Sequence, residues 1–159
     1  MQKLTELLAR LTAAEVEYVL VGGLAAYIHG SSLTTRDVDV CCRLDDVNLR
    51  RLELALSGLH PAHRMRPDLP LVLTPAPSPP FQNLYLRTDL GVIDCLGHVL
   101  GIGGFDEVLS HSIRIGLPFG EIRILDLETL IKAKEAMGRP HDQLTVQYLR
   151  AIQRQHQQG

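Results

Sequence analysis

Two aspartates one residue apart, Asp37 and Asp39, are the residues whose types and spacing best fit metal chemistry. They alternate with Val38 and Val40, which is the period of a β-strand with one polar and one apolar face. Residues i and i+2 of a strand share a face, so the two carboxylates should lie roughly 7 Å apart on one side. Magnesium prefers such oxygen ligands and completes its shell with water and substrate phosphates. The pattern therefore predicts a magnesium site on this strand, although a solvated strand end is the alternative.

A third carboxylate is expected to complete the site, either as a ligand of a second metal ion or as a base. Asp94 is the candidate because it stands alone among apolar residues in segment 92–96, which the pattern predicts to be a strand. A charge there is unfavourable unless a metal ion or a partner offsets its desolvation.

A glycine pair, Gly22-Gly23, separates the apolar run 18–21 from a short apolar segment, 24–28, that should form a helix. Backbone N–H groups at such a corner can bind a phosphate, and glycine allows the phosphate a close approach. The pair therefore predicts a phosphate site, and a simple tight turn is the alternative.

Lys134 is expected on the inward side of a helix that Asp126 should cap. It follows apolar residues of segment 127–131 at helical spacing, whereas Lys132 is turned away from that stripe. An inward lysine needs an anion to offset its burial, and a triphosphate or Asp94 would serve. The alternative is an amine that reaches water at the end of the stripe.

The composition indicates a soluble globular protein of one domain, residues 1–159. The chain has 45% hydrophobic and 21% charged residues, which is enough to bury a core without disulfides. A formal net charge of −2 argues against a strongly basic nucleic-acid coat protein. Three cysteines form no disulfide framework and fit a reducing compartment. The sequence shows neither a membrane-span run nor a signal-peptide pattern, so we expect a cytoplasmic protein without a membrane partner.

Helical and strand patterns alternate irregularly along the chain, which predicts an α/β (α+β) fold with a mixed sheet flanked by helices. The expected helices are 4–11, 24–28, 46–58, 105–109, one after Asp126 and one from about 142 to 153, with Leu144, Tyr148, Leu149 and Ile152 inward and a frayed tail. The expected strands are 18–21, 37–42, 71–73, 84–88, 92–96, 112–115 and 121–125. Residues 60–80 contain seven of the nine prolines and predict a long irregular excursion. In it, Arg64 and Arg66 are candidates for contact with RNA, the alternative being a solvated face.

These segments together resemble the nucleotidyltransferase superfamily of the DNA-polymerase-beta type. Its pattern of a glycine pair, two carboxylates on one strand and a third on another is matched by Gly22-Gly23, a gap of thirteen residues, Asp37-Val38-Asp39-Val40 and Ile93-Asp94-Cys95. Residues 21–30, 35–39, 124–134 and 138–142 are similar to small bacterial proteins related to AbiEii-type toxins and minimal nucleotidyltransferases.

The resemblance implies a nucleotidyltransferase fold with a short C-terminal helical extension at 126–155. It also implies a magnesium-dependent enzyme that transfers a nucleoside monophosphate from a nucleoside triphosphate, such as ATP, to a hydroxyl of tRNA or protein. A cognate toxin or antitoxin is an expected partner. The residues implied in catalysis and in binding two Mg²⁺ ions are Asp37, Asp39 and Asp94. The residues implied in nucleotide binding are Gly22, Gly23, Arg36 and Lys134.

Two positions depart from the family pattern. Relatives often have serine at the position of Gly23 and arginine at the position of Leu33, so the nucleotide preference stays open. One alternative is a non-catalytic binding partner with the same fold, similar to an antitoxin. Another is transfer to a small-molecule acceptor such as an aminoglycoside, for which a larger second domain is expected.

Overall fold

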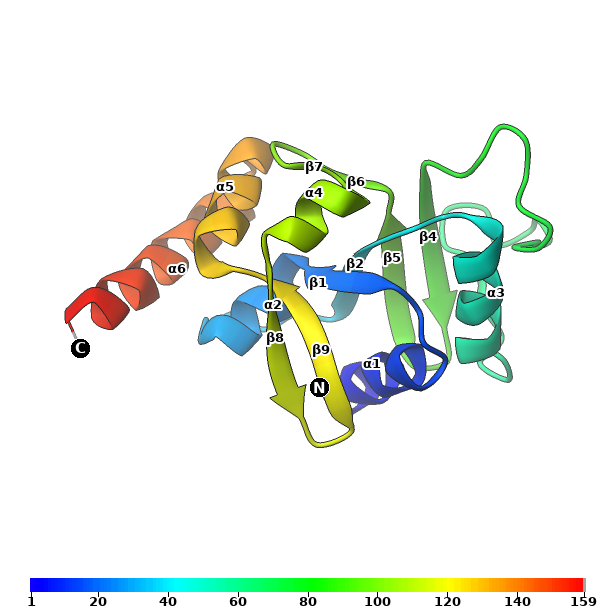
Figure 1. Ribbon diagram of the computed structural model, residues 1–159, viewed down its shortest axis with the longest axis horizontal. Helices are drawn as coiled ribbons and strands as arrows, with labels where there is room; N and C mark the ends of the chain where they lie inside the picture. Colours follow the sequence, from blue (N-terminus) through cyan, green and yellow to red (C-terminus); the bar gives the residue numbers. More distant parts are fainter. Residues whose placement is uncertain (159) are drawn as a thin grey trace.

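A computed structural model describes residues 1–158 as a sheet with helices packed around it (Figure 1). The helices are α1 (Gln2–Ala13), α2 (Gly22–His29), α3 (Asp46–Ala55), α4 (Phe105–Ser110), α5 (Leu127–Met137) and α6 (Pro140–Gln158). The strands are β1 (Tyr18–Val21), β2 (Asp37–Cys42), β3 (Ala62–His63), β4 (Asn83–Thr88), β5 (Gly91–Leu96), β6 (His98–Val99), β7 (Gly103–Gly104), β8 (Ser112–Leu117) and β9 (Gly120–Leu125).

The main sheet is mixed and has seven strands in the order β3-β4-β5-β2-β1-β9-β8. Its central strand, β2, pairs in parallel with β5 and antiparallel with β1. β1 runs parallel to β9, and the other neighbours are antiparallel. The expected α/β class with a mixed sheet and flanking helices is confirmed.

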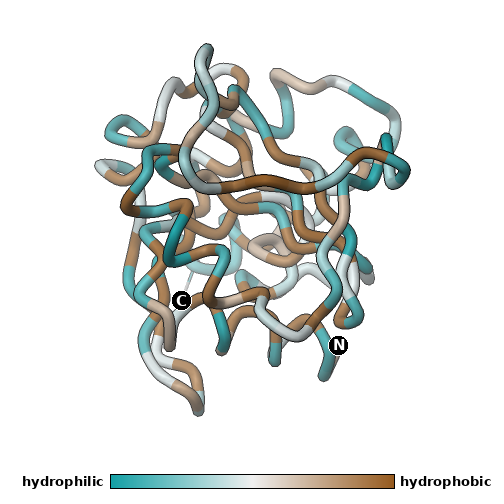
Figure 2. The backbone as a smooth tube through the Cα atoms, turned by 90° about the vertical axis from the view of Figure 1, so that its right-hand side faces the viewer, coloured by the Kyte–Doolittle hydropathy of each residue, from teal (hydrophilic) through white to brown (hydrophobic). Residues whose placement is uncertain are grey.

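Alternation along the strands gives the sheet two different faces. Val38, Val40, Ile93 and Leu86 are fully buried on one face. The other face holds the acidic residues of β2 and β5. In Figure 2 several hydrophobic segments of the chain cross the middle of the molecule. The apolar face therefore anchors the strands, and the register leaves the polar face available for a site.

Helices pack around the sheet in two groups. α1 contacts β2, β5 and β9, and α3 lies beside it. The stripe predicted for the first helix is confirmed, because its leucines at positions 4, 7, 8 and 11 are all buried. α2 contacts α5 and α6, which in turn pack against each other. Within residues 1–158, no helix combines the length and apolar character needed to cross a bilayer.

Several predicted boundaries around the proline-rich excursion are wrong. α3 begins after Asp45, whose side chain accepts a hydrogen bond from the Asn48 N–H, and it ends at Ala55 rather than at position 58. Residues 71–73 form no strand, although Leu73 is buried. The short strand of this region is instead β3, which pairs with β4. Prolines remove backbone donors, so few stretches between 60 and 80 can join a sheet.

The last helix differs from the prediction in its length and in its inward face. α6 begins at Pro140 and continues to Gln158, so residues 154–158 are helical where a frayed tail was expected. Leu144 and Tyr148 are 42% and 39% exposed, whereas Asp142 and Leu149 are fully buried. The helix is rotated because it buries a carboxylate, which a hydrophobic pattern does not anticipate.

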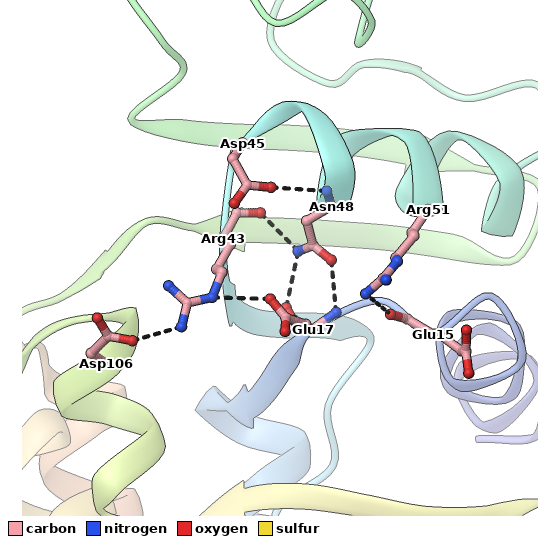
Figure 3. A network of polar contacts seen from close by, with 7 residues as sticks. All are labelled: Glu15, Glu17, Arg43, Asp45, Asn48, Arg51 and Asp106. Carbon is pink, nitrogen blue, oxygen red and sulfur yellow. Dashed lines mark hydrogen bonds and ion pairs between the residues drawn. The ribbon is translucent and has the colours of Figure 1, made fainter.

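Asn48 connects α3 to two chain segments, the one before β1 and the one after β2, which are antiparallel neighbours in the sheet (Figure 3). Its Nδ2 donates to the carbonyl oxygens of Glu17 (3.0 Å) and Arg43 (2.8 Å), and its Oδ1 accepts from the Glu17 N–H at 2.7 Å. The side chain is 2% exposed. One amide therefore satisfies three backbone groups that border the central strands.

Replacing Asn48 with alanine should lower the free energy of unfolding by about 2–4 kcal/mol, because three partly buried backbone groups lose their partner. Urea denaturation measures the change. Arg51→Ala is the control, since Arg51 makes one exposed bond to the Glu15 carbonyl in the same network and should cost under about 1 kcal/mol. Equal losses in the two variants would contradict this account.

Candidate active site

β2 and β5 bring the three predicted carboxylates to one face of the sheet. Asp39 is paired directly with Asp94 across the parallel strands, and Asp37 precedes Asp39 by two residues, opposite Val92. Asp37 is exposed, while Asp39 and Asp94 are half-buried. Across residues 1–158, however, no three His, Cys, Asp or Glu side chains are grouped closely enough to form a preassembled metal centre. The sheet register therefore brings the acids to one place, and their side chains are not yet arranged as a three-ligand cage.

Gly22 forms the corner beside Asp39. It has φ +72°, and a Cβ atom there would lie 2.3 Å from the Asp39 Oδ2. Val21 is the register partner of Asp39, so the chain turns into α2 directly next to this carboxylate. A Cβ on Gly23 would meet Thr35 Oγ1 at 3.0 Å. The first glycine is thus required both by its left-handed backbone and by the room that the carboxylate takes.

Burial chiefly raises the pKa of Asp39, to about 6. The negative charges of Asp94 and Asp37 raise it further, whereas the positive charges of Lys134 and Arg139 oppose the shift. At neutral pH Asp39 is therefore a destabilised carboxylate, held in the folded chain without full compensation of its charge.

Asp94 is engaged by a residue that the sequence did not associate with it. The Arg64 Nη2 donates to both Asp94 carboxylate oxygens, at 2.9 and 2.8 Å. Burial raises the pKa of Asp94, and the bonds and charge of Arg64 offset only part of this rise. The two residues are thirty positions apart and no local pattern links them, so the pair depends on the path of the excursion.

Lys134 is buried, at 8% exposure, and Lys132 is exposed, which confirms the predicted inward orientation. Its anionic partner is neither Asp94 nor any other expected residue, because its Nζ lies 3.5 Å from Asp142 Oδ1. Arg139 also donates to Asp142, from Nε at 2.6 Å. Burial raises the pKa of Asp142, but the Arg139 bonds and the Lys134 charge outweigh burial and leave it lowered.

The sequence analysis missed Arg139 and Asp142 as site residues. Their i, i+3 spacing after Gly138 was a usable signal, because it places a cation and an anion on one side of a helix start. Two cations share one carboxylate here, so the cluster retains a net positive charge next to Asp39.

A cleft of about 260 Å³ adjoins these groups. Its polar end includes Asp39, Gly22, Lys134 and Arg139. Apolar and neutral side chains line the remainder: Val21, Asn83, Tyr85, Leu96, His98, Val99, Leu100, Leu130, Ala133 and Met137. A larger hollow of about 830 Å³ shares three of these residues but none of the predicted site residues. The smaller cleft is therefore the candidate binding site.

Other predicted residues lie outside this cleft. Gly23, Asp37, Asp94 and Arg36 do not line it, and Arg36 is exposed at the loop before β2. Cys41 shares the strand face of Asp39, but burial raises the pKa of its thiol to about 12, which leaves it unreactive at neutral pH.

The donor set fits a magnesium ion that shares its ligands with a nucleotide. Magnesium is typically held by one or two carboxylates together with water and phosphates. Asp37 and Asp39 have no ion-pair partner within residues 1–158, and a bound dication would offset the burial and the neighbouring carboxylate charges that raise the pKa of Asp39. Asp94 would be a further ligand only if it turned from Arg64.

The sequence matches no protein-family model and no curated protein. Among solved structures, the chain is similar to a protein of Thermotoga maritima that is described as a "putative nucleotidyltransferase". The match has a TM-score of 0.56 and 16% sequence identity, and it covers 91% of this chain and 88% of the other. At this identity the similarity shows a common fold, a mixed sheet flanked by helices.

Gly22→Ala should destabilise the protein more than Gly58→Ala does. Both glycines have positive φ, +72° and +81°, but a Cβ on Gly58 meets nothing within 4 Å. Backbone strain alone should cost about 1–2 kcal/mol at each, and Gly22→Ala should lose about 1–2 kcal/mol more because it displaces Asp39. Thermal and urea unfolding measure the stability of both variants. Equal decreases in the free energy of unfolding would show that the Asp39 side chain moves aside at no cost.

The stability of the wild-type chain should decrease with rising pH where Asp39 titrates. Its folded pKa of about 6 exceeds the ordinary aspartate value of 3.8, so between these values the folded state holds a proton that the unfolded state has lost. Asp39→Asn removes this dependence. In metal-free buffer, urea unfolding should show the variant equal to wild type below pH 4 and more stable by about 1–3 kcal/mol above pH 6. Parallel curves from pH 4 to 7 would refute the raised pKa.

Proposed function

We propose that this protein is a magnesium-dependent nucleotidyltransferase that moves a nucleoside monophosphate from a nucleoside triphosphate to an acceptor hydroxyl. The observation that supports this most is the convergence of Asp39, Asp94 and Asp37 on one sheet face beside the Gly22 corner and two cations. The common fold with a protein described as a nucleotidyltransferase adds support.

In this proposal Asp37 and Asp39 would hold magnesium together with the triphosphate, and Asp94 would hold a second ion or take the proton of the acceptor hydroxyl. The metal ions, when bound, stabilise negative charge on the attacking and leaving oxygens. The acceptor oxygen forms a bond to the α-phosphorus, the bond to pyrophosphate breaks, and the hydroxyl proton passes to an Asp94 carboxylate oxygen or to water.

Lys134 and Arg139 are the candidates for binding the triphosphate. They lie beside Asp39 in the cleft, and Asp142 balances only one of their two charges. Lys134 is buried against Asp142, whereas the Arg139 side chain is 61% exposed, so the pair presents positive charge with which a polyphosphate would form charge-assisted hydrogen bonds. Asp142 would orient both cations. The apolar wall formed by Leu130, Val99 and their neighbours has the character of a nucleoside site, with Asn83 and His98 as polar groups.

The acceptor we favour is a hydroxyl of tRNA or of a protein, with ATP among the candidate donors. The sequence resemblance to AbiEii-type toxins supports this choice, together with a cytoplasmic setting and a toxin or antitoxin partner.

A second candidate is a protein with the same fold that binds without turnover. The Arg64–Asp94 ion pair favours it, because the third carboxylate is already neutralised. Glycine at position 23 and leucine at position 33 also depart from the catalytic family pattern. Binding of nucleotide without transfer is what distinguishes this candidate from the first.

Incubation with each α-labelled nucleoside triphosphate, Mg²⁺, and either total tRNA or lysate protein should give labelled acceptor and pyrophosphate with the wild-type chain. Asp39→Asn should reduce the transfer rate by about a hundredfold or more, because it removes a ligand charge at the reacting phosphates. Asp68→Asn, an exposed aspartate in the excursion, should leave the rate unchanged. Bound nucleotide with no transfer in any variant would favour the non-catalytic candidate.

A further inference from the structure

Arg64 contacts both carboxylate oxygens of Asp94, the atoms through which Asp94 would bind a metal ion. Its Nη2 contacts both oxygens, and the side chains of Arg64 and Asp94 are 36% and 15% exposed. The guanidinium also lies over the Tyr85 ring, 5.4 Å from its centroid. The positive charge of Arg64 therefore already contacts Asp94, the more buried of the two side chains.

The two other carboxylates of the site are in a different state. Asp39 is the register partner of Asp94, and Asp37 lies two residues before Asp39 on the same face, but within residues 1–158 neither Asp37 nor Asp39 forms an ion pair. Asp37 and Asp39 are therefore available to a cation, whereas Asp94 is already paired with Arg64. This arrangement agrees with the lack of a three-ligand grouping among the described residues.

We propose that Arg64 is a tethered competitor of the divalent cation: Asp94 becomes a metal ligand only when the Arg64 side chain leaves it. The inference rests on the proposed function, because it concerns the same site. It makes the proline-rich excursion a part of the protein that controls cation loading.

The exchange requires little movement of the main chain. The Arg64 N–H donates to the Tyr85 carbonyl oxygen at 2.8 Å, directly after β3 pairs with β4. The backbone is therefore anchored to the sheet while the partly exposed side chain can rotate toward solvent. A cation that takes Asp94 as a ligand must displace the guanidinium, so its measured affinity is weaker than that of a site with Asp94 free, by the population ratio of the two states.

Mn²⁺ binding to the full-length chain, measured by isothermal titration calorimetry without nucleotide, tests this competition. Mn²⁺ is a suitable probe because it takes the same oxygen ligands. Arg64→Gln should bind Mn²⁺ about five- to tenfold more tightly than wild type, the range expected when one partly buried ion pair no longer competes. Arg66→Gln is the matched control, since Arg66 pairs with Asp68 and not with Asp94. It removes the same charge from the same segment and should change the affinity less than about twofold.

Asp94→Asn provides the second comparison, because the gain from Arg64→Gln should vanish in its background. Circular dichroism and urea unfolding establish that each variant is folded. If Arg64→Gln is unfolded, Arg64→Lys, whose shorter side chain should hold Asp94 less well, should still bind Mn²⁺ more tightly than wild type, by a smaller factor. Equal affinity in the Arg64 and Arg66 variants overturns the competition but leaves the proposed function in place. Absence of Asp39-dependent Mn²⁺ binding in every variant overturns both.

Discussion

The burial of negative charge at Asp39 is the constraint on which the rest of this structure depends. Its carboxylate lies beside the acids at 37 and 94 on the central strands, and burial together with their repulsion raises its pKa to about 6. Such a group persists only where the surrounding fold holds it in place. Gly22 makes room for the carboxylate, and the fully buried apolar face of β2 and β5 fixes the strand register beneath it.

Compensation for this charge comes from the C-terminal helices. Lys134 on α5 and Arg139 at the start of α6 oppose the shift at Asp39, and both are held by the buried Asp142. A single carboxylate thus determines how α6 is rotated against α5 and which cations face the cleft. Asp142 therefore affects both packing and electrostatics, because it orients α6 and also offsets part of the positive charge beside Asp39.

Local patterns in the sequence were enough to predict the acids, the glycine corner and the inward lysine. Alternation placed Asp37 and Asp39 on one strand face, and the apolar strand around Asp94 was recognised. These are short-range features, with periods of two or 3.6 residues. The partners of those residues could not be predicted. Arg64 reaches Asp94 across thirty positions. The inward face of α6 follows from the buried Lys134–Asp142 pair, and a count of apolar residues would place Asp142 in solvent.

The parallel pairing of β2 with β5 has a consequence for how this protein can diversify. Parallel neighbours need a long crossover, and here residues 43–90 form it, including α3, β3 and β4. The antiparallel β4–β5 pair holds the end of this crossover in register, so its middle can lengthen or shorten without moving the acids. The entropy of loop closure makes this inexpensive, at about 0.6 kcal/mol for each doubling of length. Changes of length between positions 64 and 82 would therefore reshape this surface segment while β2 and β5 keep the register that pairs Asp39 with Asp94.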